Sequence, residues 1–195
     1  MPTVAIVYFS GQNHTHLMAQ AIAEGAKQVK DTQVELLRIT GKQITDGRWQ
    51  DDTILAKLNE ADAIVFGSPT YMGGVAAQFK AFLDNTDAWF EQKWKNKLAA
   101  GFTHSSSLSG DKQGTLLYLA TFAAQMAMVW VNAGDMPSHY FGKKDDEVNR
   151  LGAFLGVMGQ SELDMSDKPA EIHSGDRLTA EKFGTRIAEA VRRWN

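Results

Sequence analysis

Small and hydroxyl-bearing residues gather in one short stretch near the N-terminus. An apolar run at 4–8 (VAIVY) leads directly into the sequence SGQNHT at 10–15, which opens a helix. The Ser10 and Thr15 hydroxyls, the Asn13 amide and the backbone N–H groups can converge on one anion, and the positive end of the helix dipole adds to the attraction. This pattern predicts a phosphate-binding loop at the first strand-to-helix turn.

The kind of phosphate site follows from what the loop lacks. No Gly-Lys-Ser/Thr follows, so it is not a Walker loop, and the Gly-x-Gly-x-x-Gly spacing of dinucleotide sites is absent. Hydroxyl groups without a lysine suit a phosphate monoester held by neutral donors, and flavin mononucleotide (FMN) is the common ligand of that kind in flavodoxin-like sheets. A Ser/Thr-rich helix N-cap without a ligand is the alternative that this loop alone leaves open.

Two later loops have a similar composition, and each follows an apolar run of strand length. The run at 63–67 is followed by SPTYMGG at 68–74, and the run at 98–103 is followed by HSSSLSGD at 104–111. Because ligands of open parallel sheets bind at the carboxyl ends of the strands, we expect the three loops to form one site. Glycine, serine and proline also dominate ordinary turns, which is the competing interpretation.

Apolar patterning predicts the elements that hold these loops, as with Met18, Ile22 and Ala26, which recur at helical spacing. Strands are expected at 4–9, 33–39, 63–67, 98–103 and 128–131, helices at 15–30, 53–59, 75–85, 115–126 and 179–194, and a polar turn at 40–48. This alternation predicts an α/β fold, a flavodoxin-like doubly wound five-stranded parallel sheet with helices on both faces. We expect one domain over residues 1–195, with the stretch 132–176 serving as a lid, an oligomer contact or an irregular surface segment.

The composition limits the chemistry. The chain has 195 residues, of which 44% are hydrophobic and 22% charged, and a formal charge of −3 without a basic run, so we expect no nucleic-acid partner. It has no cysteine, which excludes disulfides and thiolate chemistry and leaves redox work to a bound cofactor. Its histidines lack metal-ligand spacing, so no metal site is expected. No apolar run reaches transmembrane length, and we expect a cytoplasmic protein without membrane contact.

The second loop and its helix carry a family pattern. SPTYMGG at 68–74 is followed by AQFKAFLD at 77–84, and the start of the chain adds YFS at 8–10, His14 and Met18. Together these residues resemble the flavodoxin-like NAD(P)H:quinone oxidoreductases of the WrbA type, over most of the chain. The resemblance implies FMN as cofactor, NAD(P)H as reductant and a quinone-like small molecule as electron acceptor.

The resemblance also implies roles for the loop residues. The first loop would hold the FMN phosphate, the second would line the flavin ring, and the third would flank the other edge of the ring. The implied cofactor-binding residues are Ser10, Gly11, Gln12, Asn13, His14, Thr15, Pro69, Thr70, Tyr71, Met72, Gly73, His104, Ser105, Ser106, Ser107 and Ser109. Trp89 or Phe90 falls in the substrate-contacting segment, and no catalytic side chain is identified.

The chain departs from the family pattern at several places, and two of them concern the reductant and the flavin. Gln12 stands where the family has a tyrosine near the nicotinamide, and the segment 124–128 lacks the histidine that reaches the flavin. We therefore expect the reductant to bind less well than the flavin.

Two further expectations concern partners. The competing function is an electron-transfer flavodoxin that carries FMN without its own substrate. Such carriers are usually strongly acidic so as to dock on basic partners, and a charge of −3 favours the enzyme. Trp89, Phe90, Trp94 and Trp130 need cover, which predicts a homo-oligomer.

Overall fold

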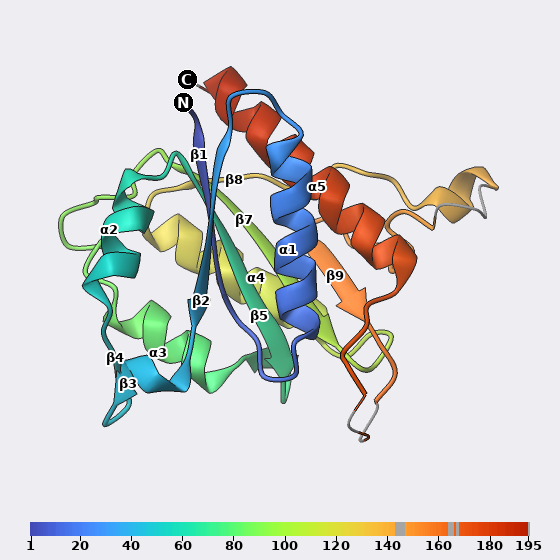
Figure 1. Cartoon of the computed structure of the whole chain (residues 1–195), viewed down its shortest axis with the longest axis horizontal. Coiled ribbons are helices and arrows are strands. Elements are labelled where there is room, and N and C mark those ends of the chain that lie inside the picture. The colour runs from blue at the N-terminus through green and yellow to red at the C-terminus, as the bar shows by residue number, and fades with distance from the viewer. Residues whose placement is uncertain (143–146, 164–165, 167, 195) are drawn as a thin grey trace.

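The computed structural model of the chain has a central, mainly parallel sheet with helices on both faces (Figure 1). The structure describes residues 1–142, 147–163, 166 and 168–194. The parallel strands of the central sheet are β1 (Thr3–Phe9), β2 (Gln33–Ile39), β5 (Ala63–Tyr71), β7 (Leu98–Ser105), β8 (Val129–Trp130) and β9 (Val157–Gln160). The helices are α1 (His14–Lys27), α2 (Asp52–Glu60), α3 (Ala77–Asn85), α4 (Lys112–Gln125) and α5 (Ser174–Trp194).

The order of the strands confirms the predicted doubly wound sheet. The sheet runs β2-β1-β5-β7, and β8 and β9 both pair with the outer side of β7. All of these pairings are parallel. The chain moves outward from β1 to β2 and then crosses to β5, so the strand order reverses between β1 and β5. Ligands of open α/β sheets bind outside such a switch point.

The fifth position of the sheet differs from the expectation, because two short strands occupy it. The predicted strand at 128–131 is reduced to β8, which pairs with the start of β7, and β9 resumes at the end of β7. Residues 131–142 and 147–156 lie outside the sheet between the two, and part of this excursion projects from the body (Figure 1). The Trp130 indole donates to the Leu155 carbonyl at 2.7 Å, which ties the two ends of the excursion together.

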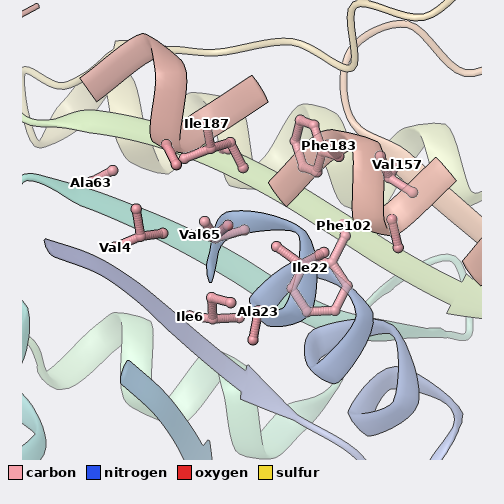
Figure 2. Packing of buried hydrophobic residues seen from close by; sticks show 14 of the residues in the cluster. Val4, Ile6, Ile22, Ala23, Ala63, Val65, Phe102, Val157, Phe183 and Ile187 are labelled. Carbon is pink, nitrogen blue, oxygen red and sulfur yellow. The ribbon is translucent and has the colours of Figure 1, made fainter. Parts of the chain in front are cut away.

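Alternate side chains of β1 enter two separate cores. Val4, Ile6 and Tyr8 pack with α1 and α5, as Figure 2 shows for part of this cluster, whereas Ala5 and Val7 pack with α2, α3 and α4. Burial on both faces is why the run reads as continuously apolar.

Two glycines bring α1 and α5 together on one face of the sheet. A Cβ on Gly25 would lie 1.7 Å from the Glu181 carbonyl oxygen, and one on Gly184 would lie 1.9 Å from the Ile22 carbonyl oxygen. The two backbones therefore approach more closely than any larger residue allows. This contact fixes α1, whose N-terminus carries the first loop.

Smaller differences concern the ends of elements. The polar stretch at 40–48 contains a short hairpin, β3 (Ile44–Thr45) and β4 (Arg48–Trp49), instead of a simple turn. Helix α5 begins five residues earlier than the periodicity suggested, at Ser174. Among the described residues, no helix combines the length and the apolar character needed to span a bilayer.

Candidate functional site

The three predicted loops meet in one pocket of about 240 Å³ at the carboxyl ends of β1, β5 and β7. Its lining residues are Ser10, Gly11, Gln12, His14, Thr15, Pro69, Thr70, Tyr71, His104, Ser105, Ser106 and Leu163. All of these except Leu163 were expected from the sequence. None of them is acidic, so the pocket offers an anion hydroxyl, amide and imidazole groups without a repelling charge.

The first loop is held in shape by a neighbouring strand. Asn13 adopts a left-handed conformation with φ 66° just before α1, which asparagine tolerates better than most residues. The Arg38 guanidinium of β2 donates to the Ser10 carbonyl at 2.9 Å and to Asn13 Oδ1 at 3.2 Å. The backbone N–H of His16 donates to Ser10 Oγ at 3.1 Å. The loop is therefore ordered by contacts within the chain itself.

Thr15 has an unused polar group. The residue is only 2% exposed, yet its hydroxyl has no hydrogen-bond partner among the described residues. The hydroxyl oxygen is not among the fully buried polar atoms that lack a partner, so it is accessible from the pocket. Since Thr15 lines the pocket in the first turn of α1, its hydroxyl fits an acceptor oxygen that enters from outside the chain.

The second loop is a tight hairpin between β5 and the two-residue strand β6 (Gly74–Val75). Met72 and Gly73 form its tip with φ of 47° and 80°, the combination that a two-residue turn of this hand requires. Tyr71 lies over the first loop, because a Cβ on Gly11 would come within 2.4 Å of the Tyr71 hydroxyl. Glycine at position 11 thus allows the first and second loops to touch.

A buried chain of threonine hydroxyls fixes the base of the second loop. The Thr70 hydroxyl lies 2.8 Å from that of Thr103 on β7 and 2.7 Å from that of Thr115 on α4. These contacts join the ends of two strands and one helix, so the hydroxyl of Thr70 is already engaged although the residue lines the pocket.

Two histidines form one wall of the pocket. The rings of His14 and His104 stack with centroids 4.7 Å apart and planes 7° from parallel. Burial, together with the neighbouring His14 and the Lys112 and Arg150 cations, lowers the pKa of His104 to about 3. Burial also lowers the pKa of His14. Both rings are therefore neutral at pH 7, and His104 contributes a hydrogen bond to Ser161 Oγ at 3.0 Å.

The third loop rests on a lysine that the sequence reading did not single out. The Lys112 ammonium donates to Ser105 Oγ at 3.1 Å, to the Ser107 carbonyl at 2.6 Å and to the Leu108 carbonyl at 3.0 Å. Its side chain is fully buried. One signal was available: a lysine as the first residue of a helix lies at the unfavourable end of the dipole.

Some predicted residues lie outside the pocket lining. Asn13, Met72, Gly73, Ser107 and Ser109 belong to the three loops but do not line the pocket. Their proposed contacts with a cofactor stay predictions.

Trp89 and Phe90 are placed elsewhere. They form an edge-to-face pair with centroids 5.0 Å apart between α3 and β7, and neither lines the pocket. The nearby Trp94 indole donates to Asn59 Oδ1, close to the start of β5 and thus to the edge of the sheet opposite the pocket. The role of Trp89 and Phe90 as substrate contacts stays a prediction.

Gln125, at the position of the family's flavin-contacting histidine, ends α4. Helix α4 spans 14 residues, and Lys112 at its start lies at the third loop. A helix of that length is roughly 20 Å long, so Gln125 does not reach the pocket of its own chain.

Comparisons with known proteins agree with this geometry. Residues 4–143 match the family model described as NADPH-dependent FMN reductase. The chain is 40% identical over 190 residues to flavodoxin FldP of Pseudomonas aeruginosa, covering 96% of each protein. It is 34% identical over 177 residues to an NAD(P)H dehydrogenase (quinone) of Geobacter sulfurreducens, covering 82% of this chain and 86% of that protein. A solved structure of a WrbA-like flavodoxin protein from Agrobacterium tumefaciens is 37% identical, with a TM-score of 0.72 and full coverage of both chains.

Proposed function

The chain belongs to the NADPH-dependent FMN reductase family, and from this premise we propose that it binds FMN in the three-loop pocket and passes electrons from NAD(P)H to a quinone-like acceptor. Family membership and the 37% identical WrbA-like structure confirm the resemblance inferred from the second loop and its helix.

The unpaired hydroxyl of Thr15 carries the proposal. It has no partner among the described residues, it lies in the first turn of α1, and it lines a pocket without an acidic side chain. A phosphate monoester would supply the missing acceptor, and the N-terminal end of α1 favours the same negative charge.

The other loops would hold the rest of the cofactor. Tyr71 is half-exposed beside the first loop and offers an aromatic face to a flat ring. Ser105 and Ser106 close the opposite side of the pocket. Bound FMN would supply the redox chemistry, accepting two electrons and one proton from NAD(P)H and passing them to the acceptor, which takes its second proton from solvent. The chain itself binds, orients and shields the cofactor.

A second candidate function is an electron carrier. The 40% identical relative is named a flavodoxin, and a carrier needs the same cofactor pocket but no nucleotide site. Oxidation of NAD(P)H by the FMN-loaded protein separates the two, because a carrier receives its electrons from a protein partner.

Two finer points are part of the proposal. A homo-oligomer would cover the exposed aromatic side chains. A cytoplasmic location is consistent with a chain that has no cysteine to pair in an oxidising compartment.

Titration of the flavin-free protein tests cofactor binding. We expect one equivalent of FMN to bind with quenching of its fluorescence, and heat-released ligand to have the mass of FMN. FAD is the matched control, because its adenosine half finds no dinucleotide fingerprint in this chain. Selective recovery of FAD, or no uptake of either flavin, would refute the proposal.

A further inference from the structure

Lys112 is buried where a positive charge is unfavourable. It is the first residue of α4, so the positive end of the helix dipole lies beside its own charge. The side chain is fully buried, and among the described residues no carboxylate lies within ion-pair distance of its ammonium. Burial of an unpaired charge costs free energy that neutral acceptors recover only in part. Such a conflict with local stability is expected at functional sites.

The hydrogen-bond acceptors of Lys112 show that this residue shapes the third loop. They include the carbonyl groups of Ser107 and Leu108, and Gln160 Nε2 donates to the preceding carbonyl, that of Ser106, at 2.9 Å. In a trans peptide the C=O and the N–H that follows it point in opposite directions. The N–H groups of residues 107–109 therefore point away from the ammonium and amide that hold the loop. Within the described residues, none of these three N–H groups has an acceptor.

A second cation lies in the same network. The Arg150 guanidinium makes two hydrogen bonds of 2.8 Å to the Asp176 carboxylate, which is 1% exposed. Asp176 Oδ2 also accepts from the backbone N–H of Gln160 at 2.8 Å, which links this pair to the third loop. Lys112, Arg150 and Asp176 together carry one positive charge in excess.

Lys112 is charged at neutral pH. Burial lowers its pKa to about 8, with Asp176 raising it and Arg150 lowering it further. The ammonium form therefore predominates at pH 7.

We propose that Lys112 is a positioning residue that shapes the third loop and holds a positive charge behind it, so that the loop stabilises reduced flavin more than oxidised flavin. This inference rests on the proposed function. When flavin takes up two electrons and one proton from NAD(P)H, which leaves as NAD(P)⁺, the ring gains one negative charge. A fixed positive charge buried behind the loop and N–H groups that this contact orients stabilise that charge without reorganisation.

The test compares two substitutions that change the buried charge in opposite directions. Lys112→Met removes a positive charge, and we expect the midpoint potential of bound FMN to fall by at least the equivalent of a tenfold change in the equilibrium constant, about 30 mV for a two-electron couple. Asp176→Asn removes the negative charge in the network, and we expect the potential to rise. Lys27→Met, at the exposed far end of α1, is the matched control and should leave it unchanged. Potentials are measured by equilibration with redox dyes, alongside the affinity for oxidised FMN.

The potential isolates the charge from a purely structural effect. A distorted loop that weakens the binding of oxidised and reduced FMN equally leaves the midpoint potential unchanged. Such a distortion also gives no reason for the potential to fall in Lys112→Met and to rise in Asp176→Asn. Equal potentials in wild type and in FMN-loaded Lys112→Met would overturn the inference. If Lys112→Met does not fold, Asp176→Asn decides, because an unchanged or lower potential there contradicts the inference. Absence of FMN binding by the wild type would overturn the proposed function as well.

Discussion

Ser10 and Thr15 both line the pocket, but their hydroxyls stand in different situations. Ser10 Oγ already accepts the backbone N–H of His16, so its removal would damage the start of α1 as well as a ligand contact. The Thr15 hydroxyl makes no hydrogen bond to any described residue. Thr15 is therefore the sharper probe of the phosphate site.

Thr15→Val keeps the shape of the side chain and removes the hydroxyl. We expect FMN to bind less tightly by about 1–3 kcal/mol, the range for leaving a charged acceptor without a donor, while thermal stability of the flavin-free protein is retained. The measurement is quenching of flavin fluorescence on titration. Thr121→Val on the exposed side of α4 is the control. Equal FMN affinity in Thr15→Val and wild type would place the phosphate elsewhere.

His104 makes stability depend on pH. Its pKa is about 3 in the folded protein against an ordinary value of 6.5, so between these values the unfolded chain binds more protons than the folded one. The free energy of unfolding should therefore fall as pH falls from 6.5 towards 3, at up to about 1.4 kcal/mol per pH unit. Urea unfolding at a series of pH values measures this slope. His104→Gln should flatten it, and an unchanged slope would show that other groups cause it.

The residue composition of the pocket loops predicts them from the sequence, but it does not predict the buried charged residues that support them. Ser10 to Thr15 is a local pattern of small and hydroxyl residues after an apolar strand, and such a pattern can be read from sequence alone. Lys112 looks like an ordinary helix residue until its burial is known. Arg150 and Asp176 are 26 positions apart, and their pairing depends on how the excursion returns to the sheet.

Among the elements, the fifth strand shows the limit of periodicity most clearly. The sequence predicts a strand at 128–131 but none within the stretch 132–176, which contains β9. An apolar run shows that a segment is buried, but it does not show which strand it pairs with. The two halves are joined through space by contacts on β7, and no local pattern records them. The stretch 132–176 also includes residues 143–146, 164–165 and 167, which lie outside the described part of the chain.

The packing of α1 on α5 depends on Gly184. A Cβ there would meet the Ile22 carbonyl oxygen at 1.9 Å, so Gly184→Ala forces the helices apart. We expect a loss of about 1–3 kcal/mol in the free energy of unfolding, as in other overpacked cores. Urea denaturation measures it. Gly41→Ala, where a Cβ would meet nothing within 4 Å, is the control, and equal midpoints for both variants would contradict the close contact.

At the scale of the whole molecule, exposed aromatic side chains favour association with another copy of the chain. Phe90 is 80% exposed beside Trp89, and Tyr140 and Phe141 are exposed on the excursion that projects from the body. We expect light scattering at micromolar concentration to give a multiple of the 21.5 kDa chain mass, because burial of such patches drives association. Phe90→Ser should shift the equilibrium towards the monomer. A mass of 21.5 kDa for the wild type would exclude the oligomer.

The balance between enzyme and carrier is also a property of the whole molecule. A net charge of −3 is small for a protein that docks on basic electron-transfer partners. Gln12, which lines the pocket in place of the family's tyrosine, predicts a weakened nucleotide contact. Gln125 lies too far from its own pocket to contribute, so the expectation that the reductant binds less well than the flavin rests on Gln12 alone.

Stopped-flow reduction of the FMN-loaded protein tests the central claim most directly. The account predicts that NADH or NADPH bleaches the flavin absorbance more slowly than dithionite does, and that a quinone added afterwards restores it. Dithionite is the control, because it reduces the flavin without a nucleotide site. Bleaching by dithionite but by neither nucleotide would contradict the account and identify the chain as an electron carrier.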